Sequence, residues 1–159
     1  MLLLACNSDS YSGDGQLIDA GVGAAHERYL LDLGEIGTGS FSFQMKGLPL
    51  EDFTLGFEIS SAYSSENLCD SKPLNNLVEI QLSDSAGHQE IGASKPLKEW
   101  TWSCRSDNVS QSFVYLGDGT MGSSFVPEKD RPYSLSVAVS DPIPGQYHVK
   151  LVAIGGGWK

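Results

Sequence analysis

The sequence predicts an all-β protein, an antiparallel β-sandwich of about eight strands, of immunoglobulin-like or jelly-roll type. Three observations lead to this prediction. Apolar and polar residues alternate with a period of two through most of the chain after residue 26, as half-buried strands require. Clusters of Gly, Pro, Asp and Ser separate the alternating segments. Helical periodicity is almost absent. The 159 residues suffice for one buried core, so we expect a single domain over residues 26–159.

Each predicted strand places its apolar residues on one face. In chain order, the strands are expected at residues 27–33, 40–46, 53–60, 77–83, 98–104, 112–119, 132–140 and 146–154. The side chains predicted to face the core are those of Phe41, Phe43, Met45, Phe53, Leu55, Phe57, Ile59, Val78, Ile80, Leu82, Phe113, Tyr115, Tyr133, Leu135, Val137, Val139, Tyr147, Val149, Leu151 and Ala153. The turn residues 141–145 predict that the last two strands form a hairpin. The polar segment 60–76 is predicted to hold a short helix or an irregular loop.

The chain is strongly acidic, and this limits its partners. Twenty Asp and Glu residues against ten Lys and Arg residues give a formal charge of -10. Such a field repels nucleic acid and anionic lipid headgroups and favours basic partners. No stretch approaches the roughly 20 apolar residues that a membrane-spanning helix needs. We therefore expect neither a nucleic-acid partner nor a transmembrane helix.

The first residues carry a motif with a chemical meaning. The run Leu3-Leu4-Ala5-Cys6 has an apolar residue three positions before a cysteine and a small residue directly before it. It resembles the lipobox of bacterial lipoproteins. The resemblance implies that a signal peptidase cleaves after Ala5 and that Cys6 carries diacylglycerol on its thiol. Asn7 in place of Asp at the next position resembles lipoproteins that are sent on to the outer membrane.

This resemblance divides the chain into three parts. Residues 1–5 are expected to be the remnant of a truncated signal peptide. Residues 6–25, which begin with a Ser-, Gly- and Asp-rich run, are expected to form a flexible tether. The domain at 26–159 would then be held by lipid at the periplasmic face of the outer membrane, in the cell envelope.

The cysteine count agrees with a lipidated Cys6. The chain has three cysteines, an odd number that usually leaves a free thiol in an exported protein. If Cys6 carries lipid, Cys69 and Cys104 remain as a pair, which the oxidising envelope would keep as a disulfide. A metal site or a redox pair is the weaker alternative, because the two cysteines lack C-x-x-C spacing.

Tryptophans supply the second candidate site. Trp100, Trp102 and Cys104 alternate, so the sequence predicts that they share one face of a strand. The two indoles are expected to pack in the core around the disulfide. The alternative is an aromatic platform that stacks on sugar rings. Trp158, near the chain end, either caps the last strand or serves as a contact residue.

Residues that commonly carry catalysis are scattered along the chain. His26, His88 and His148 lack metal-ligand spacing, and no nucleophile motif is present. Glu58 and Glu79 are candidates for the carboxylate pair of a glycoside hydrolase, but outward-facing polar alternation accounts for both. We therefore expect a protein that is not an enzyme and that holds neither a metal nor another cofactor.

Two functions remain as hypotheses. The first is a lipid-anchored, non-enzymatic binding protein of the periplasm that recognises a protein partner. It would be either an immunity-type lipoprotein that neutralises a basic toxin or hydrolase, or an accessory subunit of an envelope complex. The alternative is a carbohydrate-binding sandwich module that uses Trp100, Trp102 and Trp158.

Overall fold

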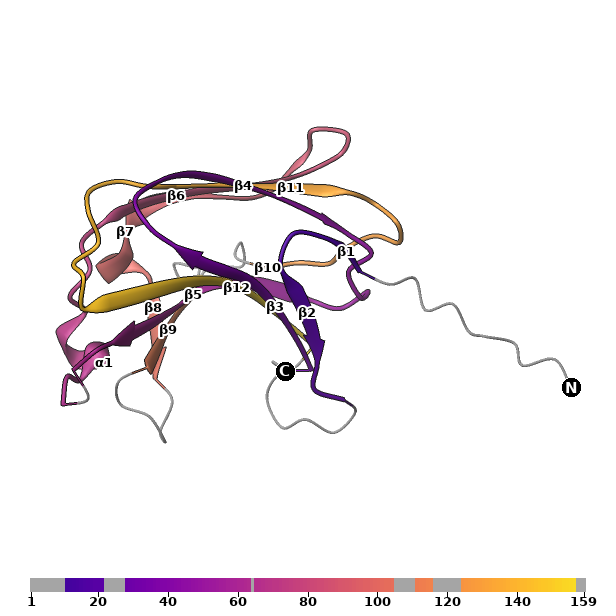
Figure 1. Cartoon of the computed structure of the whole chain (residues 1–159). Coiled ribbons are helices and arrows are strands. Elements are labelled where there is room, and N and C mark those ends of the chain that lie inside the picture. Colours follow the sequence, from indigo (N-terminus) through magenta and orange to yellow (C-terminus); the bar gives the residue numbers. More distant parts are fainter. Residues whose placement is uncertain (1–10, 22–27, 64, 105–110, 116–123, 157–159) are drawn as a thin grey trace, which may run out of the picture.

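The computed structural model describes residues 11–21, 28–63, 65–104, 111–115 and 124–156. Within them the chain forms two antiparallel sheets packed face to face, so the predicted β-sandwich is confirmed (Figure 1). The first sheet has the order β1-β4-β11-β6-β7. Its strands are β1 (Ser12–Gly13), β4 (Gly39–Lys46), β11 (Tyr133–Val139), β6 (Leu77–Asp84) and β7 (Gln89–Pro96).

The second sheet has seven strands, in the order β2-β3-β12-β5-β9-β8, with β10 pairing β5. These strands are β2 (Gln16–Asp19), β3 (Tyr29–Ile36), β12 (Tyr147–Gly155), β5 (Phe53–Ser61), β9 (Gln111–Tyr115), β8 (Thr101–Cys104) and β10 (Ser124–Phe125). The two helices are short, α1 at Leu68–Ser71 and a 3-10 turn at Leu97–Glu99. The first of them lies in the segment predicted to hold a short helix or an irregular loop.

The order of the longer strands distinguishes the two predicted topologies. Strands β3, β12, β5 and β9 lie side by side in one sheet, and β4, β11, β6 and β7 lie side by side in the other. The chain changes sheet at seven of its eleven connections, whereas β2–β3, β6–β7, β8–β9 and β9–β10 stay within one sheet. This interleaving is the jelly-roll arrangement.

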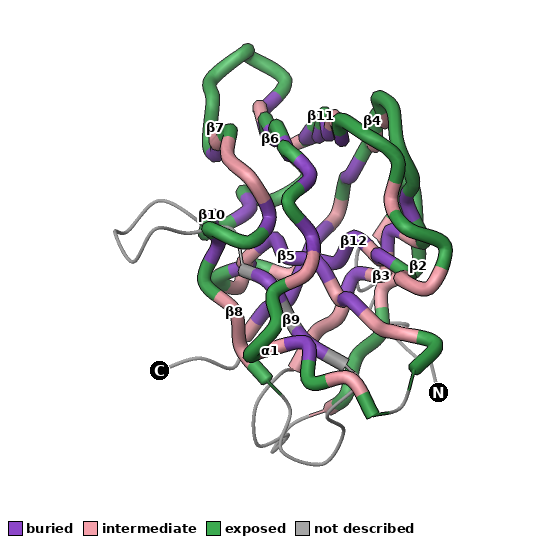
Figure 2. The backbone as a smooth tube through the Cα atoms, turned by 90° about the vertical axis from the view of Figure 1, so that its left-hand side faces the viewer, coloured by how far each residue is buried: buried purple, intermediate pink, exposed green. Residues whose placement is uncertain are grey.

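The core lies between the sheets, where Figure 2 shows the buried residues. Four fully buried residues of β5, Phe53, Leu55, Phe57 and Ile59, point inward at alternate positions, because strand side chains alternate between faces. The predicted inward faces of β6 and β11 are likewise buried. Phe41, Phe43 and Tyr147 are only partly buried and pack against the edge of this core.

In β9, the side chains of Phe113 and Tyr115, which were expected to face inward, lie outside the described part of the structure. Ser112 and Val114 of this strand are fully buried. Ser112 pairs with Cys104, and its hydroxyl oxygen lies 3.6 Å from Cys69 Sγ. The small serine therefore occupies the inward position beside the disulfide, which an aromatic ring would overfill.

The predicted hairpin of the last two strands is wrong. β11 pairs with β4 and β6, whereas β12 pairs with β3 and β5 in the other sheet. The connection 140–146 therefore crosses from one sheet to the other. It begins with Asp141 at φ 60°, and Pro142 and Pro144 keep it from pairing as a tight turn.

The strand count and the start of the domain need correction as well. The described residues form twelve strands, not eight, because β1, β2, β7 and β10 carry too little apolar alternation to be recognised. β1 and β2 lie within residues 6–25, where a tether was predicted. They pair with β4 and β3, so the sandwich begins before residue 26.

The sandwich has two ends, and the chain enters at one of them. β1 pairs with Lys46 and Met45, the last residues of β4. We call this the N-terminal end; it carries the loops at residues 47–52, 85–88 and 126–132. The opposite end carries α1 and the connection 140–146. In Figure 1 the N-terminal end is on the right and α1 is on the left.

Candidate functional site: a serine-lined face

The outward face of the five-stranded sheet is hollowed across its three central strands. A groove of about 510 Å³ runs over β4, β11 and β6. We call it the serine groove and define it by the outward residues that line it, Ser40, Ser42, Ser136, Ala138, Glu79 and Gln81. A second hollow of about 250 Å³ shares Ser40, Glu79 and Ala138 and extends toward Ser140.

Strand register brings these residues together from three distant parts of the chain. Ser40 pairs with Ala138, which pairs with Glu79, and Ser42 pairs with Ser136, which pairs with Gln81. The side chains are small on β4 and β11 and longer on β6. The floor of the groove is therefore close to the sheet backbone, and β6 forms its raised side.

Most polar side chains of the serine groove form no hydrogen bond to other described residues. Among the described residues, the hydroxyls of Ser40, Ser42 and Ser136 and the amide of Gln81 form no hydrogen bond to protein, although the neighbouring Ser134 donates to Gln44 Oε1 at 2.9 Å. Each free hydroxyl can donate one hydrogen bond and accept others. The groove thus offers several solvent-facing hydrogen-bonding groups to a ligand.

Glu79 is the one charged side chain of the serine groove. Its Oε1 accepts a long hydrogen bond of 3.4 Å from Ser94 Oγ on β7, and it has no cationic partner within the part of the chain that the structure describes. A desolvated carboxylate requires a counter-charge or several donors. A ligand that covers Glu79 must therefore supply a cation or donor groups.

The outward face of the other sheet differs, because both of its basic side chains on β12 already have acidic partners. Lys150 Nζ lies 3.3 Å from Asp32 Oδ2, and His148 Nδ1 lies 2.7 Å from Glu35 Oε1. On the same face, Val152 and Ile154 are buried. Among the described surfaces, the serine groove is the better candidate for recognition.

Core packing, the expected arrangement of the two indoles, is found for Trp100, whereas Trp102 is only partly buried. Trp100 is 3 % exposed and belongs to the core, with Lys95 Nζ 4.6 Å from its ring centre. Trp102 is partly buried, and its indole N–H donates to the Leu97 carbonyl at 3.0 Å. The buried Trp100 offers no free face to a sugar. Trp158 lies outside the described residues.

The predicted disulfide is confirmed. Cys69, in α1, is bonded to Cys104, the last residue of β8, with a Cα–Cα distance of 6.1 Å. Asn67 caps α1, since its Oδ1 accepts from the backbone N–H groups of Cys69 and Asp70. The bond therefore joins the helix to an edge strand. Cys6, the predicted lipidation site, lies outside the described residues.

Glu58 and Glu79 cannot form a carboxylate pair. Glu58 is on the outward face of β5 and pairs across to Lys150, whereas Glu79 is on the outward face of the other sheet. A glycosidase pair stands at most about 9.5 Å apart, and the stacked sheets alone are about 10 Å apart. Within the described residues, no group of three or more His, Cys, Asp or Glu is placed to hold a metal ion.

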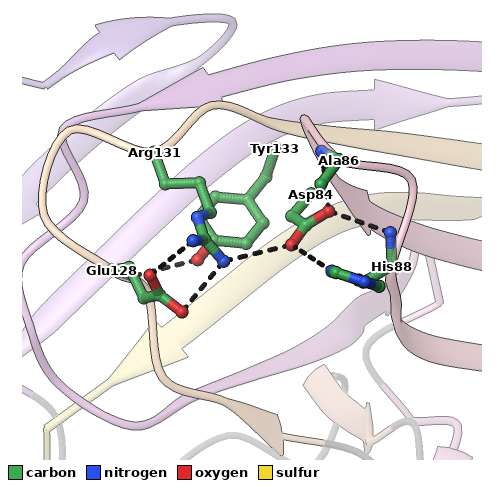
Figure 3. Close-up of polar contacts among 6 residues, drawn as sticks. All are labelled: Asp84, Ala86, His88, Glu128, Arg131 and Tyr133. Carbon is green, nitrogen blue, oxygen red and sulfur yellow. Dashed lines mark hydrogen bonds and ion pairs between the residues drawn. The ribbon is translucent and has the colours of Figure 1, made fainter.

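A second polar cluster lies at the N-terminal end (Figure 3). The Asp84 side chain is 1 % exposed and accepts hydrogen bonds from the backbone N–H groups of Ala86 and His88, both at 2.9 Å. Arg131 Nη1 lies 3.1 Å from Asp84 Oδ2, and Arg131 Nη2 lies 2.7 Å from Glu128. The cluster fastens the β6–β7 turn to the segment before β11. Its charges are mutually satisfied, which indicates a structural role.

This cluster sets a pH dependence of stability. Burial acts to raise the pKa of Asp84, but hydrogen bonds from His88 and Ala86 lower it more, so the pKa lies below its ordinary value. A lowered folded-state pKa stabilises the fold at neutral pH and loses that contribution as the pH falls through it. We expect Asp84→Asn to weaken the decline in melting temperature below about pH 4. We also expect it to lower the melting temperature at pH 7 by several degrees.

Thermal unfolding followed by circular dichroism from pH 7 to pH 2 measures both effects. Glu90→Gln removes an exposed carboxylate from the neighbouring strand β7 and should leave the melting temperature at pH 7 nearly unchanged. An acid decline in Asp84→Asn as steep as that of the unmodified chain would contradict the assignment.

The sequence predicted neither the serine groove nor the Asp84 cluster. The serines of β4 and β11 were visible only as the polar half of an alternating pattern, and nothing local indicates which strands lie side by side. The Asp84 turn was visible as a turn signal, and an aspartate four residues before a histidine was the available hint.

Comparison with known protein families finds no family that matches this chain. Comparison with curated proteins finds no match either. Neither of the helices in the described residues is long and apolar enough to cross a membrane.

Proposed function

We propose that this chain is a lipid-anchored, non-enzymatic binding protein of the bacterial envelope and that it recognises a basic protein partner through the serine groove. The observation that carries the proposal is the groove itself, which is lined by three serines and a carboxylate. Among the described residues, these hydroxyls have no protein partner and the carboxylate has no cationic neighbour. An immunity-type lipoprotein and an accessory subunit of an envelope complex are the two forms this function would take.

The chemistry of the groove favours a Lys- or Arg-bearing segment of a partner. Small side chains on β4 and β11 let a polypeptide approach the sheet closely. Glu79 would then pair with a cationic side chain, and the Ser40, Ser42 and Ser136 hydroxyls would bond to the partner's polar groups. The charge of -10 on the whole chain would speed the encounter with a basic protein.

The anchor rests on the lipobox-like residues and on the cysteine pairing. Because Cys69 and Cys104 are bonded to each other, Cys6 is the one cysteine that stays outside the disulfide. It is also the residue that the motif assigns to lipid. The burial of Trp100 favours this proposal over the alternative, a carbohydrate-binding module that would use Trp100, Trp102 and Trp158.

Replacing Glu79 by lysine is expected to weaken partner binding at least about tenfold, because a complementary charge contact becomes a repulsive one. The purified chain and the variant are immobilised and exposed to envelope extract, and retained proteins are identified by mass spectrometry. Affinity for the recovered partner is then measured by titration at two salt concentrations.

The matched control is Glu90→Lys, which makes the same charge change at an exposed position of β7 outside the groove. It should retain the partner with nearly unchanged affinity. Equal retention by Glu79→Lys and Glu90→Lys would place recognition elsewhere on the surface. Recovery of glycans alone would overturn the proposal of a protein partner.

A further inference from the structure

The length of chain between Cys6 and the sandwich limits how the domain can stand on a membrane. Residue 11 is already at the sandwich, because Ser12 pairs with Lys46. Cys6 lies five residues before Tyr11, and five residues span at most about 18 Å when fully extended. A lipid on Cys6 would therefore hold the N-terminal end close to the bilayer.

The opposite end is out of reach of such a short segment. β4 has eight residues and is about 27 Å long at the usual rise of an antiparallel strand. α1 and the connection 140–146 lie beyond its far end. The anchor can therefore bring only the N-terminal end, or the flanks next to it, to the membrane surface.

Two exposed aliphatic side chains lie where this geometry would put the bilayer. The two most exposed large aliphatic side chains of the described residues are Leu50, 60 % exposed, and Val126, 61 % exposed. Leu50 lies in the β4–β5 loop. Val126 directly follows β10, whose Phe125 pairs with Phe53 at the start of β5. Both therefore belong to the N-terminal end.

We propose that the N-terminal end rests on the bilayer surface, with Leu50 and Val126 inserted at the boundary between headgroups and acyl chains. Moving apolar side chains from water to this depth of the bilayer lowers the free energy, which favours binding. The inference rests on the proposed anchor at Cys6 but not on the serine groove. The inference also predicts where the serine groove lies. Ser40 is five residues from Met45 along β4, so it would lie about 17 Å farther from the membrane than Met45.

The test attaches the lipid chemically, so that it does not depend on processing in the cell. The full chain, purified with its disulfide formed, has one remaining cysteine, Cys6, which is conjugated to a maleimide carrying a single fourteen-carbon chain. One such chain alone binds membranes only marginally, so further contacts become measurable. Partitioning is measured with neutral phosphatidylcholine vesicles, because the acidic chain would be repelled by anionic ones.

The variant carrying both Leu50→Asp and Val126→Asp is expected to bind these vesicles at least fivefold more weakly. The matched control is Leu77→Asp, since Leu77 is 37 % exposed and begins β6 at the opposite end. Its binding should equal that of the unmodified conjugate. Circular dichroism checks that each variant is folded.

A second measurement reads the orientation directly in the unmodified conjugate, with methyl-labelled leucine and valine in nanodiscs. Nitroxide-bearing lipid should broaden the Leu50 and Val126 signals severalfold more than that of Leu77. Equal broadening of the three signals would overturn the orientation, as would equal binding of the aspartate variants. Failure of lipidation in the cell would overturn only the anchor, because the conjugate does not depend on it.

Discussion

Removal of the disulfide by Cys69→Ser and Cys104→Ser together is expected to lower the free energy of unfolding by about 3–4 kcal/mol. The bond spans 35 residues, and opening a loop of this length gives the unfolded chain more conformations. The native state also loses the covalent link between β8 and α1. β8 is an edge strand that pairs only with β9 among the described residues, and the bond ties it to α1.

Guanidinium unfolding followed by circular dichroism measures this loss, with and without reductant. Cys6→Ser is the matched control, because it makes the same substitution at a cysteine outside the disulfide. It should unfold at the same denaturant concentration as the unmodified chain. A double variant as stable as Cys6→Ser would show that the crosslink does not stabilise the fold.

The period-two pattern predicted the core where strands are long and fully apolar on one side. The buried faces of residues 53–59 and 133–139 could be predicted without tertiary information, because burial of alternate side chains follows from strand geometry. The pattern is ambiguous in β9, because residues 113–115 are all apolar or aromatic. Ser112, which the pattern did not place in the core, is buried beside both sulfur atoms of the disulfide.

The serine groove could not be predicted, for a different reason. Ser42 and Ser136 are paired neighbours in space but lie 94 residues apart in the chain. Only the jelly-roll order makes them neighbours. The predicted hairpin of β11 and β12 pairs β11 with the wrong strand, whereas its neighbours in the structure are β4 and β6.

The fold determines how far the serine groove would lie from the proposed anchor at Cys6. The serine groove is in the half of the five-stranded sheet nearer the opposite end, because its lining residues on β4 begin at Ser40, whereas β1 pairs at Lys46. With the N-terminal end on the bilayer, the groove would face the periplasm. A rigid sandwich on a short segment would then present the groove at a nearly constant height.

The substitution Cys6→Ser is expected to move the protein from the membrane fraction to the supernatant almost completely. Without the thiol no diacylglycerol can be attached, so the variant would lose the lipid on which the proposed anchor depends. The two exposed side chains Leu50 and Val126 would not hold it, since even a single acyl chain binds only marginally. The measurement is fractionation of a bacterium that expresses the chain behind a complete signal peptide ending in its own Leu3-Leu4-Ala5. The variant without Cys69 and Cys104 is the control and should stay with the membrane, because those cysteines carry no lipid. An unchanged membrane fraction for Cys6→Ser would refute the anchor.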